Sequence, residues 1–143
     1  MGGFEVTPHV TSTFKEKFNK NPKKQFFSQE VSKTVLEWME SVVDKGSGSG
    51  VKIEGYRIAG KTGTSQKALN GSYTSKKVCS FVATLPVNDP KYAVLVVVDE
   101  PSKSYAYGST VAVPVVKEII ESLIVIEKIP PNIKDHGMIV KKP

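Results

Sequence analysis

The chain has 143 residues, 39% of them apolar, which is enough for one domain with a buried core or for part of a larger domain. Its 20 basic and 14 acidic residues give a net charge of +6; the densest basic run, 15–24, is interpreted as a solvated segment, and we expect no nucleic-acid binding. A single cysteine, Cys79, excludes an internal disulfide, and His9 and His136 offer no zinc-ligand spacing, so we expect neither a metal nor a cofactor.

Signals for membrane insertion or secretion are not found in these residues. No apolar run approaches the length needed to span a bilayer, and the first ten residues lack a basic start followed by an apolar region. If the protein works outside the cytoplasm, we therefore expect a segment outside this sequence to deliver it there.

Residues 1–27 are predicted to form an irregular lead-in, because glycine and proline interrupt them repeatedly. A helix is predicted to begin after Ser28, a good capping residue, and to end at Gly46, since apolar residues recur between them at three- and four-residue spacing. The sequence GSGSG at 46–50 is typical of a flexible connector, and it can equally cap the helix and turn the chain into a strand.

Three strands are predicted next, within 51–61, 77–86 and 91–100, from their β-branched and apolar residues. The four residues VNDP between the last two are too few for a parallel return, so these strands should form an antiparallel hairpin. Cys79 lies within the second strand, where a small buried hydrophobe is its expected role.

A second helix is predicted after Gly108, with Ser109 or Thr110 as its cap and Pro114 in its first turn. Its apolar residues cover more than one stripe, which predicts that the helix is covered on two sides. It should stop before Pro130, and residues 132–143 are predicted to be a disordered tail. These elements together predict an α+β fold, an antiparallel sheet with flanking helices.

The stretch GYRIAGKTGT at 55–64 has two incompatible interpretations. Gly55, Gly60, Lys61 and Thr62 fit the spacing of a nucleotide phosphate-binding loop, and Asp99 could then hold Mg²⁺ at the end of an apolar strand. That loop requires a helix beginning at the lysine and a parallel sheet, whereas the sequence predicts a strand and a hairpin. The nucleotide-binding module is therefore the alternative hypothesis.

In the second interpretation, Lys61, Thr62, Gly63 and Thr64 lie on a strand edge. An ammonium group, two hydroxyls and a glycine can accommodate a peptide lying along the backbone and can hold a carboxylate. Such an edge suits acyl transfer to or from a peptide.

Three longer blocks of the sequence resemble a known protein family: VVDKGSGSGVKIEGYRIAGKTGTSQ, SFVATLPVNDPKYAVLVVVDEP and YGSTVAVPVVKEII. In order and spacing they are similar to the C-terminal part of the transpeptidase domain of class B penicillin-binding proteins, the division-type enzymes that cross-link peptidoglycan. The resemblance covers about Gly2 to Pro131 and implies a partial serine β-lactamase/transpeptidase-like fold over residues 28–131.

The resemblance also implies roles for the KTGT residues. Lys61 would support the proton network and the electrostatics of the active site, and the main-chain N–H of Thr64 would be one donor of the oxyanion hole. Thr62 and Thr64 would bind the carboxylate of a D-Ala-D-Ala stem peptide or of a β-lactam, and Gly63 would keep the approach open. Tyr105, Tyr107 and Gly108 are interpreted as structural residues at the turn into the last helix.

The nucleophile of this family, the serine of an S-x-x-K motif, has no credible match here. Ser12 to Lys15 lies in a charged segment too close to Lys61, Ser49 to Lys52 lies in the glycine-rich connector, and S-x-N does not occur. The chain is therefore expected to be a fragment of a serine D,D-transpeptidase that carries the substrate and oxyanion side and cannot be acylated alone. A non-catalytic interaction remnant is a further hypothesis.

Partners and location follow from the resemblance alone. It implies stem peptides and β-lactams as ligands, the upstream half of the parent domain as a structural partner, and division proteins as further candidates. It also implies a location on the outer face of the bacterial cytoplasmic membrane, through an anchor in the N-terminal part of the parent.

Overall fold

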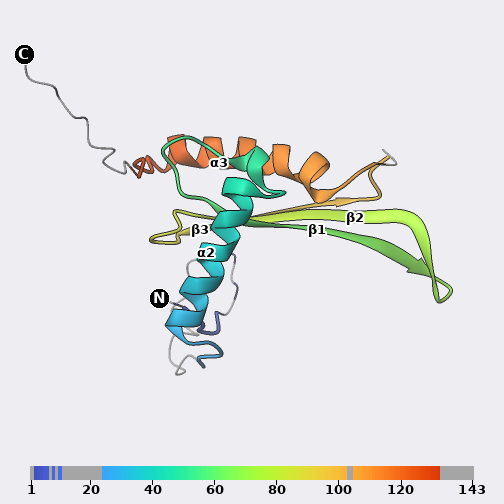
Figure 1. The fold of residues 1–143 in the computed structure, drawn as a ribbon, viewed down its shortest axis with the longest axis horizontal. Coiled ribbons are helices and arrows are strands. Elements are labelled where there is room, and N and C mark those ends of the chain that lie inside the picture. Colours follow the sequence, from blue (N-terminus) through green and yellow to red (C-terminus); the bar gives the residue numbers. More distant parts are fainter. Residues whose placement is uncertain (1, 7, 9, 11–23, 103–104, 133–143) are drawn as a thin grey trace, which may run out of the picture. The chain divides into compact units, whose positions relative to one another are not determined.

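The computed structural model describes residues 2–6, 8, 10, 24–102 and 105–132 (Figure 1). The chain divides into two compact units, residues 1–37 and 38–143. The second unit contains a three-stranded antiparallel sheet with the strand order β1-β2-β3. Because helices accompany this sheet, the predicted α+β class is confirmed.

The first unit contains a small antiparallel contact before helix α2 (Gln29–Lys45). Phe4 pairs with Gln25, and the N–H of Phe26 donates to the carbonyl of Gly3 at 2.6 Å. Gly3 has a φ of 74°, a conformation that favours glycine. The N–H of Val31 donates to Ser28 Oγ at 3.1 Å, which confirms the predicted helix cap.

The connector after α2 is ordered by successive backbone hydrogen bonds. The N–H groups of Gly46 and Gly48 both donate to the carbonyl of Val42, at 3.0 and 3.1 Å, and thereby close the helix end. A short 3₁₀ helix, η1 (Ser49–Val51), follows directly. The connector is therefore a built helix cap, the second of the two roles that the sequence left open.

The strands are β1 (Ala59–Leu69), β2 (Ser72–Leu85) and β3 (Tyr92–Asp99). The prediction of a strand from residue 51 is wrong up to residue 58, because that stretch contains η1 and a turn at Gly55, whose φ is 80°. β1 instead continues to Leu69, and Asn70 and Gly71, with φ values of 51° and 79°, turn the chain into β2. The predicted antiparallel hairpin of β2 and β3 is confirmed.

The core lies between one face of the sheet and the C-terminal helix. A π-helical turn, η2 (Gly108–Ala112), leads into α3 (Val113–Ile126), which contacts β2 and β3. Val116 and Ile120 of α3 are fully buried, as is Phe81 of β2. Val115 and Ile119 on the same helix are exposed, so the expectation that α3 is covered on two sides is wrong for the described residues.

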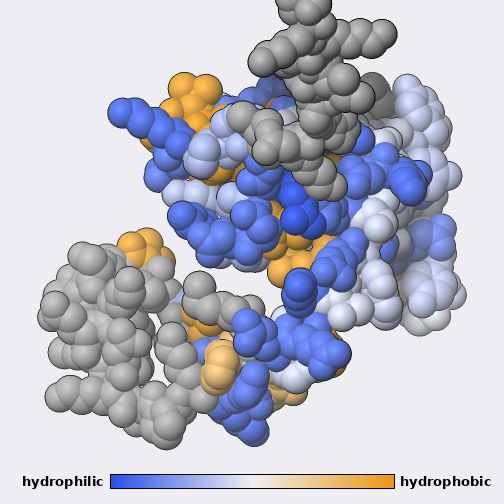
Figure 2. Space-filling view, turned by 60° about the vertical axis from the view of Figure 1, so that its left-hand side comes forward, coloured by the Kyte–Doolittle hydropathy of each residue, from blue (hydrophilic) through white to orange (hydrophobic). Residues whose placement is uncertain are grey.

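The opposite face of the sheet leaves large apolar side chains exposed. Successive residues of β3 point to opposite faces of the sheet. Val94 points toward α3 and is buried, whereas Leu95 and Val97 point to the other face and are 64% and 54% exposed. Apolar side chains reach the surface in several places on the side shown in Figure 2.

Candidate functional site

The KTGT residues lie in the first half of β1, an edge strand of the described sheet. Lys61 is opposite Val82, and Gly63 is opposite Ser80. The strand runs straight through the motif, with no helix beginning at Lys61, and Asp99 ends an antiparallel strand. The phosphate-binding loop interpretation is therefore wrong, because it needs a helix N-terminus and a parallel sheet at this place.

The register of the sheet determines where the backbone groups of the motif point. Directly after β3, the N–H of Glu100 donates to the carbonyl of Lys77 at 2.9 Å, and these two residues continue the register of the β2–β3 ladder by one pair. Such pairs alternate along an antiparallel ladder, so the even-numbered residues of β2 bond to the odd-numbered residues of β1. The N–H groups of Thr62 and Thr64 consequently point to the open edge.

The Lys61 and Thr62 side chains both make contacts beside that edge. Lys61 is exposed, and its ammonium group donates to the carbonyl oxygen of Thr62 at 3.0 Å. The hydroxyl of Thr62 lies 3.0 Å from the hydroxyl of Ser47 in the connector after α2. Ser47 could not be identified from the sequence, because only the folded chain brings the connector to the strand.

Thr64 is held by the start of η2. The N–H of Gly108 donates to Thr64 Oγ1 at 3.0 Å. A Cβ on Gly108 would lie 2.4 Å from the carbonyl oxygen of Ser80, so only glycine permits this close approach. Gly108 was interpreted as structural from the sequence, and its contact with the motif was missed.

Gly63 and Cys79 complete the surroundings of the motif. A Cβ on Gly63 would lie 2.5 Å from Ser80 Oγ, so a larger residue there would require the Ser80 hydroxyl to turn away. Cys79 is opposite Thr64 in the ladder and has no exposed surface, which confirms the predicted buried role. Among the described residues, no cluster of His, Cys, Asp and Glu is suited to hold a metal ion.

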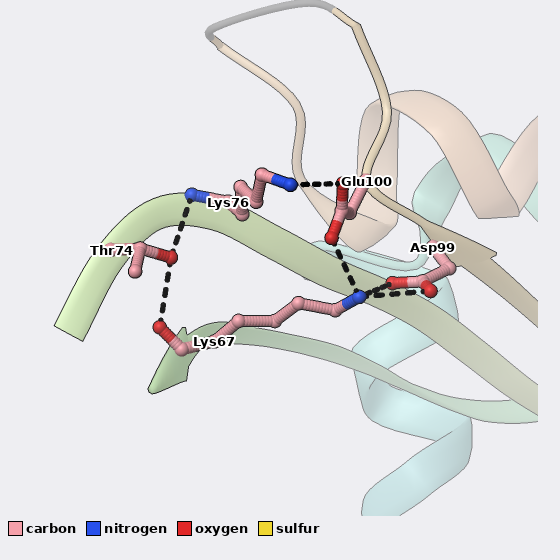
Figure 3. Close-up of polar contacts among 5 residues, drawn as sticks. All are labelled: Lys67, Thr74, Lys76, Asp99 and Glu100. Carbon is pink, nitrogen blue, oxygen red and sulfur yellow. Dashed lines mark hydrogen bonds and ion pairs between the residues drawn. The ribbon is translucent and has the colours of Figure 1, made fainter. Parts of the chain in front are cut away.

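An ion-pair cluster fixes β1 beyond the motif (Figure 3). Lys67 Nζ lies 2.7 Å from Asp99 and 2.9 Å from Glu100, and Lys76 Nζ lies 2.9 Å from Glu100. Hydrogen bonds to Asp99 and then to Glu100 raise the pKa of Lys67, and hydrogen bonds from Lys67 and then from Lys76 lower the pKa of Glu100. The cluster joins the β1–β2 hairpin to the end of β3.

Neither S-x-x-K sequence gains support as a nucleophile motif. Ser12 to Lys15 lies outside the described residues. Ser49 is the first residue of η1, and Lys52 follows that 3₁₀ turn and pairs with Asp44 at 3.3 Å, so this serine does not begin an α-helix.

The arrangement of the motif suits a negatively charged or electron-rich peptide group. Two outward amides, two threonine hydroxyls and one exposed ammonium group line the same strand edge. Amide hydrogens and hydroxyls can stabilise an oxyanion, and an ammonium group can attract a carboxylate.

Comparison with known proteins assigns most of the chain to one protein family. Residues 1–121 match the model of the penicillin binding protein transpeptidase domain. The chain is 49% identical over 115 residues to the "Peptidoglycan D,D-transpeptidase FtsI homolog" of Chlorokybus atmophyticus, covering 79% of this chain and 17% of that protein.

Two solved structures of penicillin-binding protein 3 are similar to this chain. The apo transpeptidase domain from Burkholderia pseudomallei has a TM-score of 0.68 and 32% identity, over 80% of this chain and 36% of that chain. The Mycobacterium tuberculosis protein in complex with aztreonam has a TM-score of 0.68 and 25% identity, over 77% and 27%. The chain thus spans a minor part of the proteins it matches, and it belongs to the penicillin binding protein transpeptidase domain family.

Proposed function

We propose that this chain is the C-terminal part of the catalytic domain of a peptidoglycan D,D-transpeptidase and forms the substrate and oxyanion side of its active site. The observation that best supports the proposal is the KTGT motif on an edge strand, with the amides of Thr62 and Thr64 pointing away from the sheet. The family match and the names of its relatives support the same assignment.

In the proposed reaction, a serine contributed by residues upstream of this chain attacks the carbonyl carbon of the penultimate D-Ala of a stem peptide. The carbonyl oxygen becomes an oxyanion, which the N–H of Thr64 stabilises with a second donor from outside the chain. The intermediate expels the terminal D-Ala, and the amine of a second stem peptide then takes the acyl group from the serine. A β-lactam would acylate the same serine by opening its ring.

The side chains of the motif would bind the donor peptide. The hydroxyls of Thr62 and Thr64 lie on the same face of β1 and would donate to the carboxylate of the terminal D-Ala, or to that of a β-lactam. Lys61 would add positive charge beside them and support the proton network of the serine. Gly63 would keep the strand edge free of a side chain that bulges toward the ligand.

The upstream half of the domain is the structural partner that this assignment requires. Leu95 and Val97 expose apolar surface on the sheet face opposite α3, and Trp38 on α2 is 68% exposed. Exposed apolar residues of this size favour coverage by another protein segment. We propose that residues upstream of this chain cover this sheet face and supply the S-x-x-K and S-x-N motifs.

The remaining partners and the location follow from the same proposal. Cross-linking of peptidoglycan takes place on the outer face of the cytoplasmic membrane, where division proteins would be neighbours. In the part of the chain that the structure describes, no helix has the length and apolar content of a membrane span. The anchor would lie in the N-terminal part of the parent protein.

Labelling with a fluorescent penicillin on a denaturing gel tests the proposal. We expect no label on the 143-residue chain and a covalent label on the protein translated from the reading frame extended upstream through an S-x-x-K motif. In the extended protein, Lys61→Ala should lower the labelling rate at least about tenfold. Lys91→Ala, which removes an exposed lysine in the turn before β3, is the matched control and should leave the rate unchanged.

Two results would contradict the proposal. One is an extended protein with both upstream motifs that takes up no label, and the other is a Lys61→Ala variant that labels at the full rate. An upstream sequence that contains neither motif would instead favour a non-catalytic interaction module.

A further inference from the structure

The connector between α2 and η1 places a hydroxyl directly beside the KTGT motif. Ser47 Oγ lies 3.0 Å from Thr62 Oγ1, although 15 residues separate the two in the chain. Ser47 is exposed, and no fold requirement is evident for its hydroxyl, because the hydrogen bonds that order the connector come from backbone groups. The hydroxyl is therefore available for a role at the motif.

The position of Ser47 is set by the buried glycine that follows it. Gly48 is buried, and a Cβ there would lie 3.1 Å from the ring of Phe81. Phe81 is the cross-strand partner of Thr62 in the β1–β2 ladder. The packing of Gly48 against Phe81 thus places the connector, with Ser47 in it, beside Thr62.

The chemistry of a hydroxyl decides what this contact can do. Each hydroxyl has one hydrogen to donate and two lone pairs to accept with. If Thr62 gave its hydrogen to Ser47, it could not donate to an anion at the strand edge. If Ser47 is the donor, Thr62 keeps its hydrogen for a ligand, and accepting one hydrogen bond strengthens the one it donates.

Thr64 gives an independent example of the same arrangement in the same strand. Its hydroxyl oxygen accepts from the main-chain N–H of Gly108, a group that can only donate. The hydrogen of the Thr64 hydroxyl is therefore left for another acceptor. If Ser47 is the donor to Thr62, both threonines of the motif have an oxygen that accepts from the protein and a hydrogen left for a ligand.

We propose that Ser47 is a positioning residue, whose hydroxyl donates to Thr62 Oγ1 and so commits the Thr62 hydroxyl to donating to the carboxylate of the acyl donor. This inference rests on the proposed function, because it needs a carboxylate ligand at the KTGT edge. Ser47 does not touch the substrate; it acts through Thr62.

A double-mutant cycle on the extended protein tests the role of Ser47. The measurement is the second-order rate of acylation by a fluorescent penicillin that has a free carboxylate. Ser47→Ala should lower this rate about three- to tenfold, the effect of one hydrogen bond. Ser47→Thr keeps the hydroxyl and should restore most of the rate. Ser49→Ala in the same connector is the matched control and should have no effect.

The second arm of the cycle separates positioning from a structural role. In a Thr62→Val background, Ser47→Ala should cause no further loss, because the hydroxyl that Ser47 orients is gone. An equal loss in both backgrounds, or a full rate in Ser47→Ala alone, would overturn the inference. If the unsubstituted extended protein takes up no label, the proposed function fails and this inference fails with it. That outcome is distinguishable from the two results above, in which the unsubstituted protein is labelled.

Discussion

The main-chain N–H of Gly108 donates to Thr64 Oγ1 at 3.0 Å and thereby joins the start of η2 to the KTGT strand. The contact requires that the backbone of η2 lie directly on the ladder between Gly63 and Ser80. The geometry of the motif therefore depends on residues that follow it by more than forty positions.

Substitution of Gly108 by alanine should disrupt this contact. The new Cβ would lie 2.4 Å from Ser80 O and 2.8 Å from Gly63 O, and backbone atoms cannot move aside cheaply. We expect a loss of stability of about 1–3 kcal/mol and faster amide hydrogen exchange across 106–112, measured by mass spectrometry.

Gly71→Ala is the control for that experiment. Gly71 has a φ of 79° but nothing within 4 Å of the place that a methyl group would occupy, so its cost comes from backbone strain at the turn alone. Exchange across 106–112 should stay unchanged in this variant. Unchanged exchange in Gly108→Ala as well would show that the close approach is not needed.

Gly60→Ala should destabilise the sheet beside the motif through its contact with Phe81. The added Cβ would lie 2.5 Å from the Phe81 ring and 2.9 Å from Val82 O. We expect a loss of about 1–3 kcal/mol, measured as the shift in the denaturant midpoint of the extended protein. Adding Phe81→Leu should recover part of that loss, since it removes the ring; a strictly additive double variant would contradict this explanation.

The Lys67 cluster should make the stability of the β1–β2 hairpin depend on pH. The pKa of Glu100 is lowered from 4.5, so its contribution is present above pH 4.5 and is lost as the pH falls through the lowered folded-state pKa. The pKa of Lys67 is raised from 10.5, so its contribution is present below pH 10.5 and is lost as the pH rises through the raised folded-state pKa. Protection factors for 66–77 should therefore be highest between these limits.

Lys67→Gln should abolish most of this pH dependence and lower the protection of 66–77 at neutral pH. High salt should have the same direction of effect, since all of these charges are partly in solvent. Lys91→Gln, which removes the pair with Asp89 at 3.4 Å, is the control and should leave the hairpin unchanged. A flat pH profile in the unsubstituted protein would disprove the role of the cluster.

Arg57→Lys should weaken the connection between α2 and the approach to β1. Arg57 donates to both carboxylate oxygens of Glu40, from Nε at 2.7 Å and from Nη2 at 2.6 Å, and the Glu40 side chain is 17% exposed. Lysine cannot make two parallel hydrogen bonds to a carboxylate. We therefore expect the free energy of unfolding to fall by about 1–2 kcal/mol, measured from the shift in the denaturant midpoint. Lys52→Arg, at the exposed ion pair with Asp44, is the control and should change the free energy of unfolding by less than about 0.5 kcal/mol.

The sequence allowed prediction of those elements whose signals are local. The cap at Ser28 depends on a residue three positions from its partner, and the β2–β3 hairpin depends on a four-residue link. The extension of β1 to Leu69 was not predicted, because the residues before Asn70 are mostly polar and expose both sides to solvent. The Asn-Gly pair itself was the signal, as it is typical of two-residue hairpin turns.

The contacts that complete the site could not be predicted in the same way. The sequence placed Lys61, Thr62, Gly63 and Thr64 on one strand edge, and their proposed roles in catalysis stay predictions. Their partners Ser47 and Gly108 come from segments 15 and 44 positions away, and only the packing of the connector and of η2 on the sheet brings them close. The exposed face of α3 could not be predicted either. The spacing of apolar residues shows which sides of a helix are apolar, but not which of those sides another element covers.

The turn at Asn70 and Gly71 offers a practical consequence. It lies in the same hairpin as the KTGT motif, yet a side chain at position 71 would meet no atom within 4 Å. A small fluorophore attached to a cysteine introduced at the adjacent, exposed Ser72 would therefore mark the tip of this hairpin. Cys79 is fully buried, so the dye should react selectively at the introduced thiol.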